Sequence, residues 1–286
     1  ITPLKPIHDG TPIVAIDVSS IKIGETEIGV LCAVRGAVVW REGRRYRYFR
    51  VGPFPFHVTE DNKREILNLL RFGDLSISRS EAPRLTDIHI RLCNLIERWL
   101  QLLICQSYYD SIILLDGSLT AGTMDNPVRS LLRLLKEARA RLNSVLAISK
   151  ATNVRIFGRR ITEFLSKHKP PCILRIDWSP ASNSLRPLGD IFVARLAIDG
   201  CAFRLDIDRR IGDEGEIRAV ERLIGNDAVY LGYPETLRLA HILSTFTAGE
   251  VIGIQRFIAT KYGLKIINRP SLRRILFGPF GTRFED

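Results

Sequence analysis

A short apolar run that ends in a carboxylate limits the possible folds of this chain most strongly. The stretch "SIILLDGSL" (residues 111–119) contains an apolar segment, Ile112 to Asp116, that is typical of a buried strand. Gly117 allows the chain to turn directly after Asp116. The segment lies between residues 84–106 and 126–142, which both show helical periodicity. A buried strand between two amphipathic helices is typical of a parallel strand in an α/β sheet.

The order of the predicted elements indicates the topology of that sheet. Three strands with short links begin the chain and predict an antiparallel meander, and a short helix follows them. These elements cover residues 12–20, 27–36, 37–52 and 62–72. After the strand that ends at Asp116 and the helix that follows it, residues 144–150 predict a fifth strand. We therefore expect an α/β, ribonuclease H-like fold: a mixed five-stranded sheet flanked by helices, with the first, fourth and fifth strands parallel and adjacent.

The C-terminal half is less regular, and we expect it to elaborate this sheet. Its predicted strands cover residues 171–177, 190–199 and 201–208, and its predicted helices cover 213–225, 234–246 and 250–263. The sequence contains no long linker, repeat or low-complexity segment. We therefore expect residues 1–286 to form a single domain.

The charge of the chain favours a polyanionic partner. The sequence has 42 Lys and Arg against 31 Asp and Glu, a formal net charge of +11. The basic residues cluster in residues 41–50, 157–160, 208–210 and 269–278. In residues 41–50 they alternate with tyrosines in a strand pattern that could follow phosphates and stack on bases. The same pattern also suits an edge strand whose charges prevent aggregation.

Cysteine usage and hydropathy exclude two classes of protein. The five cysteines are scattered without a C-x-x-C spacing, which argues against a disulfide framework or a zinc site and favours core positions. No segment approaches the roughly 18–20 apolar residues of a membrane span, and the start "ITPLKPIHDG" does not resemble a signal peptide. We expect a cytoplasmic protein without membrane contact. The first residue is not Met, which leaves room for residues upstream.

Two strand-end carboxylates predict a metal site. In the expected sheet, the ends of the first and fourth strands lie side by side, which brings Asp17 of "IVAIDVSS" close to Asp116. Neighbouring carboxylates repel unless a cation lies between them, and a divalent ion is the natural occupant. Alone, each Asp is also typical of a turn. We expect the third ligand to be Glu97, although it also suits a surface position; Glu81 and Asp87 are the alternatives.

The sequence leaves two other functions open. The chain has no Walker A motif and suggests no catalytic serine or cysteine triad. Residues "DVSSIKIG" and "DGSLTAG" leave open an actin-like nucleotide-binding ATPase, which shares the strand order. A non-catalytic DNA-binding adapter is a further alternative.

Four motifs in this order and spacing resemble the NurA family: "AIDVSS", "LLDGSL", "AISKATN" and "LGYPETLRLAH". The family comprises archaeal nucleases that process DNA ends together with HerA, a hexameric ATPase translocase. The resemblance implies an Mn²⁺-dependent deoxyribonuclease that degrades single- and double-stranded DNA from 5′ to 3′ and cuts single strands internally. It also implies a role in end resection for double-strand break repair by homologous recombination, and a homodimer that docks on HerA. The sequence departs from the family at Val18, where the first motif usually has glycine.

The same resemblance implies a set of site residues. Asp17, Asp116 and His241 would bind the metal, Glu97 would join them, and Tyr233 would orient a ligand or phosphate. Mn²⁺ accepts mixed oxygen and imidazole ligands, so His241 favours it, with Mg²⁺ as a possible substitute. Lys150 follows the fifth strand, where it would face the site and neutralise a phosphate. His241 also suits helix packing, and Lys150 suits a solvated strand end. The apolar C-terminal stretch 275–284 could pack against another chain.

Overall fold

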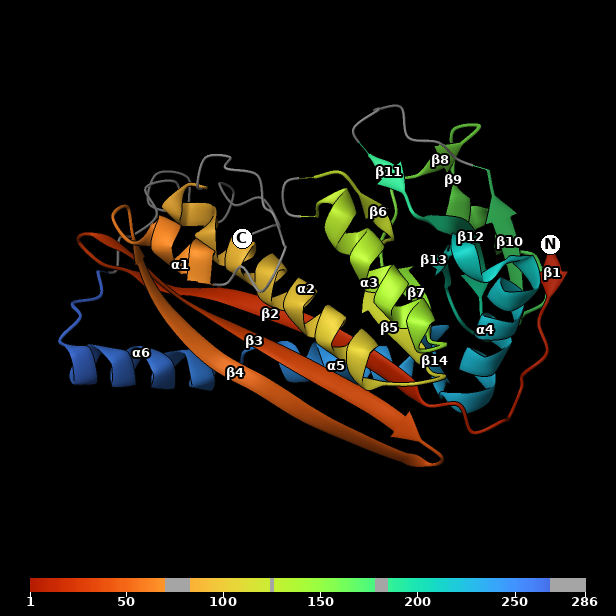
Figure 1. The fold of residues 1–286 in the computed structure, drawn as a ribbon, viewed down its shortest axis with the longest axis horizontal. Helices are drawn as coiled ribbons and strands as arrows, with labels where there is room; N and C mark the ends of the chain where they lie inside the picture. Colours follow the sequence, from red (N-terminus) through yellow and green to blue (C-terminus); the bar gives the residue numbers. More distant parts are fainter. Residues whose placement is uncertain (70–82, 124–125, 178–184, 268–286) are drawn as a thin grey trace.

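A nine-stranded mixed sheet forms the centre of the computed structural model, which describes residues 1–69, 83–123, 126–177 and 185–267 (Figure 1). Its strand order is β1-β10-β12-β13-β7-β5-β2-β3-β4. The strands of this sheet are β1 (Thr2–Pro3), β2 (Ile13–Glu25), β3 (Gly29–Glu42), β4 (Arg45–Thr59), β5 (Ile112–Asp116), β7 (Ser144–Ser149), β10 (Cys172–Ile176), β12 (Gly189–Arg195) and β13 (Ala202–Asp208).

Helices cover both faces of this sheet. They are α1 (Lys63–Leu69), α2 (Ile88–Ser107), α3 (Val128–Ala140), α4 (Asp213–Asn226), α5 (Glu235–Ser244) and α6 (Ala248–Tyr262). Short strands outside the main sheet form three two-stranded pairs: β6 (Thr120–Ala121) with β11 (Arg186–Pro187), β8 (Arg155–Ile156) with β9 (Arg159–Arg160), and β14 (Val229–Tyr230) with β15 (Tyr233–Pro234).

The strand directions confirm the expected ribonuclease H-like fold. β2, β5 and β7 are adjacent and parallel, whereas β2, β3 and β4 form an antiparallel meander. The sheet continues past β7 through β13, β12, β10 and β1, all antiparallel. The C-terminal half therefore extends the five-stranded core by hydrogen bonding to the free edge of β7.

The predicted boundary between the second and third strands was wrong. Gly36 was expected to end a strand, but β3 runs through it, and the chain turns at Gly43 instead. Gly36 lies at a register shift between β3 and β4, and a Cβ there would lie 2.9 Å from the Leu100 side chain. This glycine therefore leaves room for the Leu100 side chain of α2 and does not form a turn.

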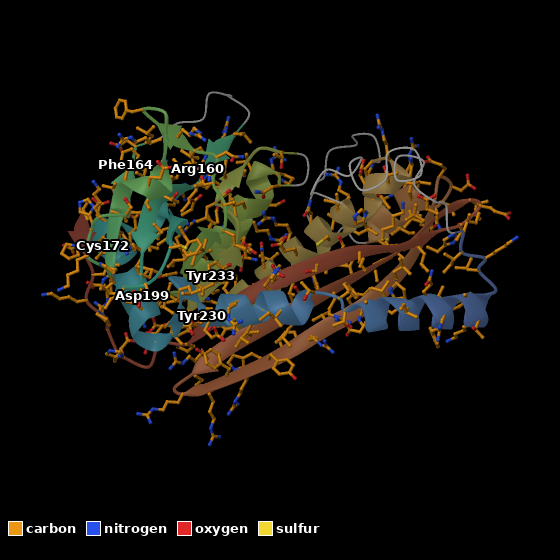
Figure 2. The ribbon with its side chains drawn as sticks, turned by 180° about the vertical axis from the view of Figure 1, so that it is seen from behind. Arg160, Phe164, Cys172, Asp199, Tyr230 and Tyr233 are labelled. Carbon is orange, nitrogen blue, oxygen red and sulfur yellow. The ribbon has the colours of Figure 1, made fainter. Side chains whose placement is uncertain are left out.

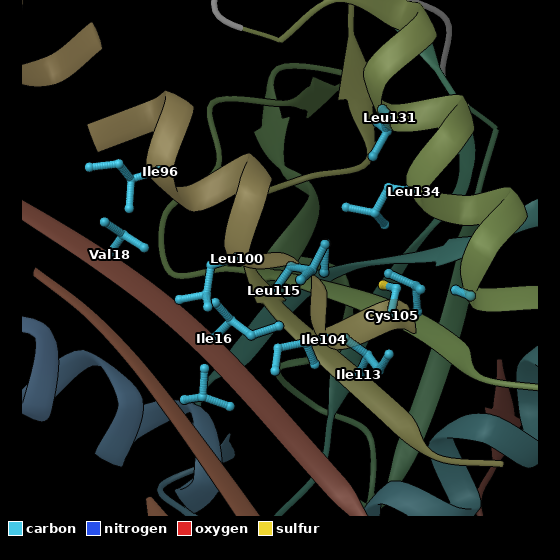
Figure 3. Close-up of a cluster of buried hydrophobic side chains, with 14 of the residues drawn as sticks. Ile16, Val18, Ile96, Leu100, Ile104, Cys105, Ile113, Leu115, Leu131 and Leu134 are labelled. Atoms are coloured by element: carbon cyan, nitrogen blue, oxygen red, sulfur yellow. The ribbon is translucent and has the colours of Figure 1, made fainter. Parts of the chain in front are cut away.

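Two apolar layers enclose the sheet, one on each face. Alternate residues of β2 and β5, such as Ile16 and Leu115, pack with α2 and α3 on one face (Figure 3). The residues between them, such as Ala15 and Leu114, pack with α4 and α5 on the other face. The near-continuous apolar runs of β2 and β5 thus reflect strands that are buried on both sides.

The long meander extends away from the rest of the molecule. β2, β3 and β4 form an elongated arm, with α6 alongside its outer part (Figure 1). The edge strand β4 contains much of the basic cluster of residues 41–50. Within it, Tyr48 is exposed, but the Tyr46 hydroxyl donates a hydrogen bond of 2.8 Å to Asp227. Tyr46 is therefore tied to the core and does not suit base stacking.

The cysteines lie only partly in the core. Cys32, Cys105 and Cys172 are buried, but Cys201 is exposed, so the core assignment was wrong for that residue. In the ranges that the structure describes, no helix is long and apolar enough to cross a membrane. Glu81 and the C-terminal stretches 269–278 and 275–284 lie outside the described residues.

Candidate metal centre

Asp17 and Asp116 occupy equivalent positions on neighbouring parallel strands. Ile16 of β2 pairs with Leu115 of β5, so the two aspartates are the next residues along each strand. Ala15 and Leu114, two residues before each aspartate, belong to the layer that packs with α4 and α5, so the two aspartate side chains share that face. β5 ends at Asp116, and Gly117 follows with φ of +117°, which allows the turn. The strand register therefore brings the two carboxylates together.

The α5 helix adds an imidazole to this pair. Donor atoms of Asp17, Asp116 and His241 all lie within 4.8 Å of one another. His241 Nδ1 lies 3.3 Å from Asp17 Oδ2. The Asp17 side chain is 9% exposed and the His241 side chain 47%, so the cluster opens from the core toward solvent on the helix side.

Hydrogen bonds from α5 orient the buried carboxylate. The Ser244 hydroxyl donates to Asp17 Oδ2 and lies 2.9 Å from the Ser19 hydroxyl. Burial raises the pKa of Asp17, the Ser244 hydrogen bond and His241 oppose this rise, and the Asp116 charge adds to it. A desolvated carboxylate with these neighbours is a strong position for a cation.

Lys150 and Tyr233 border the same cluster. Lys150 directly follows β7, and its Nζ lies 2.7 Å from Asp116 Oδ2. It also lies 5.9 Å from the centroid of the Tyr233 ring. The hydroxyl of Tyr233 is buried and has no hydrogen-bond partner among the described residues. Burial raises the pKa of Tyr233, and the charges of Asp116 and Asp17 add to the rise. Tyr233, which Figure 2 labels, is 9% exposed.

Glu97 approaches from α2, on the opposite side of the sheet. Its carboxylate is not part of the group of atoms within 4.8 Å that Asp17, Asp116 and His241 form. Burial raises the pKa of Glu97 to about 7; Arg98 opposes the rise, and the charges of Asp17 and Asp116 add to it. Its Oε1 accepts a hydrogen bond of 2.8 Å from Gln101. Glu97 is thus electrostatically coupled to the cluster, whereas the alternative ligand Asp87 lies ten residues earlier, at the exposed start of α2.

The predicted residues thus fall into two groups. The structure brings Asp17, Asp116 and His241 together, with Lys150 and Tyr233 at their border, and it places Glu97 next to this group but outside it. Sequence reasoning missed Ser244 and Ser19. Ser19 lies in "AIDVSS", two residues after Asp17, and Ser244 lies one helical turn after His241. Their closeness in the sequence to predicted ligands was the signal that could have indicated them.

The donor set fits a divalent cation. Two carboxylates and one imidazole suit Mn²⁺, which accepts oxygen and nitrogen ligands. The unpartnered Tyr233 hydroxyl next to them is a polar group that a bound ligand or water would satisfy. The hydrogen bond from Ser244 fixes the orientation of the Asp17 carboxylate, as residues around metal ligands commonly do.

A second acidic cluster has a different character. Donor atoms of Asp190, Asp213 and Glu216 lie within 4.8 Å of one another. The Arg175 guanidinium lies among them, 2.7 Å from Asp213 and 3.6 Å from Asp190, and it also contacts Glu216. This cluster therefore already contains its cation, and it ties α4 to β10 and β12.

A pocket of about 610 Å³ lies at the carboxyl edge of the parallel strands. Its lining includes Gly117 and Ser118, which follow Asp116, and Ser149, which precedes Lys150. Arg204 of β13 also lines it, and Asp206 holds the guanidinium through two hydrogen bonds of 2.7 Å. A ligand in this pocket would lie beside residues that flank Asp116 and Lys150 in the sequence.

Comparisons with known proteins agree with this fold. A family model described as the NurA domain matches residues 11–244. The crystal structure of the NurA nuclease from Sulfolobus solfataricus is 19% identical, with a TM-score of 0.57 over 92% of this chain and 87% of that chain. A crystal structure of NurA is 9% identical, with a TM-score of 0.54 over 91% and 90%. A structure of NurA bound to dAMP and manganese is 8% identical, with a TM-score of 0.52 over 94% and 91%. No curated protein sequence matches the chain.

Proposed function

Because this chain belongs to the NurA family, we propose that it is a divalent-metal-dependent nuclease that hydrolyses DNA phosphodiester bonds. The observation that carries the proposal is the cluster of Asp17, Asp116 and His241 at the ends of adjacent parallel strands. Two further findings support it. The net charge of +11 favours a polyanionic substrate, and a structurally similar NurA binds dAMP and manganese.

In this proposal, Asp17, Asp116 and His241 hold the metal, with Mn²⁺ preferred and Mg²⁺ a possible substitute, and Glu97 completes the site. A metal bound there supplies an activated water and stabilises charge on the leaving oxygen. Ser244 keeps Asp17 in the ligating orientation.

Lys150 and Tyr233 act on the substrate side of the site. Lys150, whose side chain is 41% exposed, can exchange its contact with Asp116 for a DNA phosphate. The Tyr233 hydroxyl orients a ligand or the phosphate. Both residues thus position the scissile phosphate.

We also propose the finer activity that the family resemblance suggests. The chain would degrade single- and double-stranded DNA from 5′ to 3′ and cut single strands internally. It would act as a homodimer with a HerA-type hexameric translocase in the cytoplasm, where it would resect DNA ends for double-strand break repair.

One assay tests this function. End-labelled single- and double-stranded DNA is incubated with Mn²⁺, Mg²⁺ or chelator, and the products are resolved by length. We expect cleavage with Mn²⁺, weaker cleavage with Mg²⁺, and none with chelator. ATP turnover without DNA cleavage would select the actin-like ATPase, and DNA binding without cleavage under any metal would select the adapter.

A further inference from the structure

A basic hairpin next to the site exposes an aromatic ring at its tip. β8 and β9 are joined by Phe157 and Gly158, whose φ values are +51° and +76°. Two-residue turns with both φ values positive normally contain Asn-Gly or Asp-Gly, because other side chains are strained there. The Phe157 side chain is nevertheless 96% exposed. The hairpin thus holds a large apolar residue where it costs backbone strain and contributes no burial.

The rest of the hairpin is anchored to the protein. Ile156 packs against the apolar cluster that contains the fully buried Ile161. The backbone of Ile161 donates a hydrogen bond of 3.2 Å to Val154 across the base of the hairpin. Arg155 donates a hydrogen bond of 2.9 Å to the Gly158 carbonyl. The ring of Phe157 is therefore presented on a fixed support, at the outer edge of the molecule where Figure 1 shows β8 and β9.

The charge around the ring identifies the chemistry of its partner. Arg155, Arg159 and Arg160 flank Phe157 and are all exposed; Figure 2 labels Arg160. Within the described part of the chain, no carboxylate pairs with them. An exposed aromatic ring among arginines suits a nucleic acid strand, because a base stacks on the ring while the arginines contact phosphates.

One pocket extends from the ends of β5 and β7 to the base of the hairpin. The pocket lined by Gly117 and Ser149, the sequence neighbours of Asp116 and Lys150, also has Val154 and Arg155 in its lining. Phe157 lies two residues beyond Arg155, roughly 7 Å at the strand rise. A DNA strand with a phosphate at the cluster can therefore follow the pocket to the ring.

We propose that Phe157 is a stacking platform for one base of the DNA strand bound in this pocket, with Arg155, Arg159 and Arg160 on the neighbouring phosphates. This inference rests on the proposed function, because it takes DNA as the substrate. It assigns the hairpin a positioning role outside the reacting atoms: the stacked base fixes how far the strand extends past the metal cluster.

DNA binding, measured in chelator so that no cleavage occurs, tests the proposal. Fluorescence anisotropy in chelator measures the affinity of a labelled single-stranded oligonucleotide for wild type, Phe157→Ala and Phe157→Leu. Tyr109→Ala is the matched control, since Tyr109 is also exposed but precedes β5, at the opposite end of the strand from Asp116. We expect about 10-fold weaker binding for Phe157→Ala, nearly the same loss for Phe157→Leu, and no change for Tyr109→Ala.

Abasic substitutions then identify the stacked base. Removing the base at one position should weaken binding to wild type and not to Phe157→Ala, because ring and base act as a pair. Equal binding by wild type and Phe157→Ala, or full retention by Phe157→Leu, would overturn the stacking role alone. Losses that are the same for both proteins at every abasic position would also overturn it. No DNA binding by wild type would overturn the proposed function with it.

Discussion

At the residue scale, a substitution of His241 distinguishes a metal ligand from a residue that only packs its helix. The exposed imidazole of His241 lies 3.3 Å from Asp17. His241→Ala should lower cleavage about 10- to 100-fold through weaker metal binding, and raised Mn²⁺ should partly restore it. Tyr233→Phe should cost less, because the hydroxyl has no hydrogen-bond partner among the residues that the structure describes. Cleavage rates across a Mn²⁺ titration provide the measurement, with the exposed His168→Ala as control. An unchanged rate and Mn²⁺ dependence in His241→Ala would assign this residue to packing.

The raised pKa of Glu97 predicts how metal binding depends on pH. Its pKa is raised from 4.5 to about 7, so between these values the folded protein holds a proton that the unfolded chain releases. Stability of the metal-free protein should therefore fall as pH rises through this window. Mn²⁺ must displace that proton, so its affinity should rise about 10-fold per pH unit up to about pH 7 and then level off.

Thermal melts with and without Mn²⁺ between pH 5 and 8 measure both effects. Glu97→Gln should flatten both curves, because the amide does not titrate. If the Mn²⁺-induced shift in Tm of Glu97→Gln still rose with pH as in wild type, Glu97 would not be the group that competes with the metal.

Part of the site was predictable at this scale, and part was not. Asp17 and Asp116 follow from the order of strands, because adjacent parallel strands bring their ends together. Lys150 follows from the same strand order, because β7 lies next to β5. The hydrogen bond from Ser244 to Asp17 depends on how α5 packs against β2, 227 residues away in the sequence. Periodicity does not contain that information.

At the element scale, an ion pair between a buried arginine and a half-buried glutamate helps to hold α6. Arg35 of β3 is buried and donates hydrogen bonds of 2.8 and 3.2 Å to Glu250 and one of 3.1 Å to the Thr245 carbonyl. Its guanidinium also lies 4.4 Å from the centre of the Phe246 ring. Ile258 is the only fully buried residue that α6 contributes, and Val251 and Ile254 pack half-buried against the same apolar cluster, so the ion pair supplements a small apolar contact.

Arg35→Ala should therefore release α6 and cost about 1–3 kcal/mol of stability. Hydrogen exchange should accelerate in residues 248–262 more than in the sheet. Arg238→Ala, which removes an exposed pair with Glu235, is the control and should change little. Unchanged protection of α6 in Arg35→Ala would show that its apolar contacts suffice.

Element identity was more predictable than element boundaries. The helical periodicity of residues 84–106 closely matches α2, and the apolar run of β5 ends at Asp116 as expected. The boundary at Gly36 failed because glycine serves turns and close packing alike. Only the position of Leu100 in three dimensions distinguishes the two uses.

At the scale of the whole molecule, the excess of positive charge predicts salt-sensitive DNA binding. With a net charge of +11, several Lys and Arg residues should displace counterions from phosphates. Affinity should fall by about 10³-fold or more between roughly 50 and 200 mM salt. Replacing both Arg159 and Arg160 with Ser should reduce the slope of log affinity against log salt by about 1 to 2. A flat salt response would mean that the charge serves solubility.

The central claim is that one cluster binds the metal and supports DNA cleavage. Electron paramagnetic resonance of free Mn²⁺ measures metal binding in wild type, Asp116→Asn and Asp110→Asn, and the same samples are then assayed on end-labelled DNA. Asp110 provides the matched control because it lies just before β5, at the end of the strand remote from the cluster, where it pairs with Arg222. We predict that Asp116→Asn keeps its fold, loses at least about 100-fold in Mn²⁺ affinity and no longer cleaves DNA, whereas Asp110→Asn matches wild type. An Asp116→Asn protein that binds Mn²⁺ and cleaves DNA as wild type does would contradict the account.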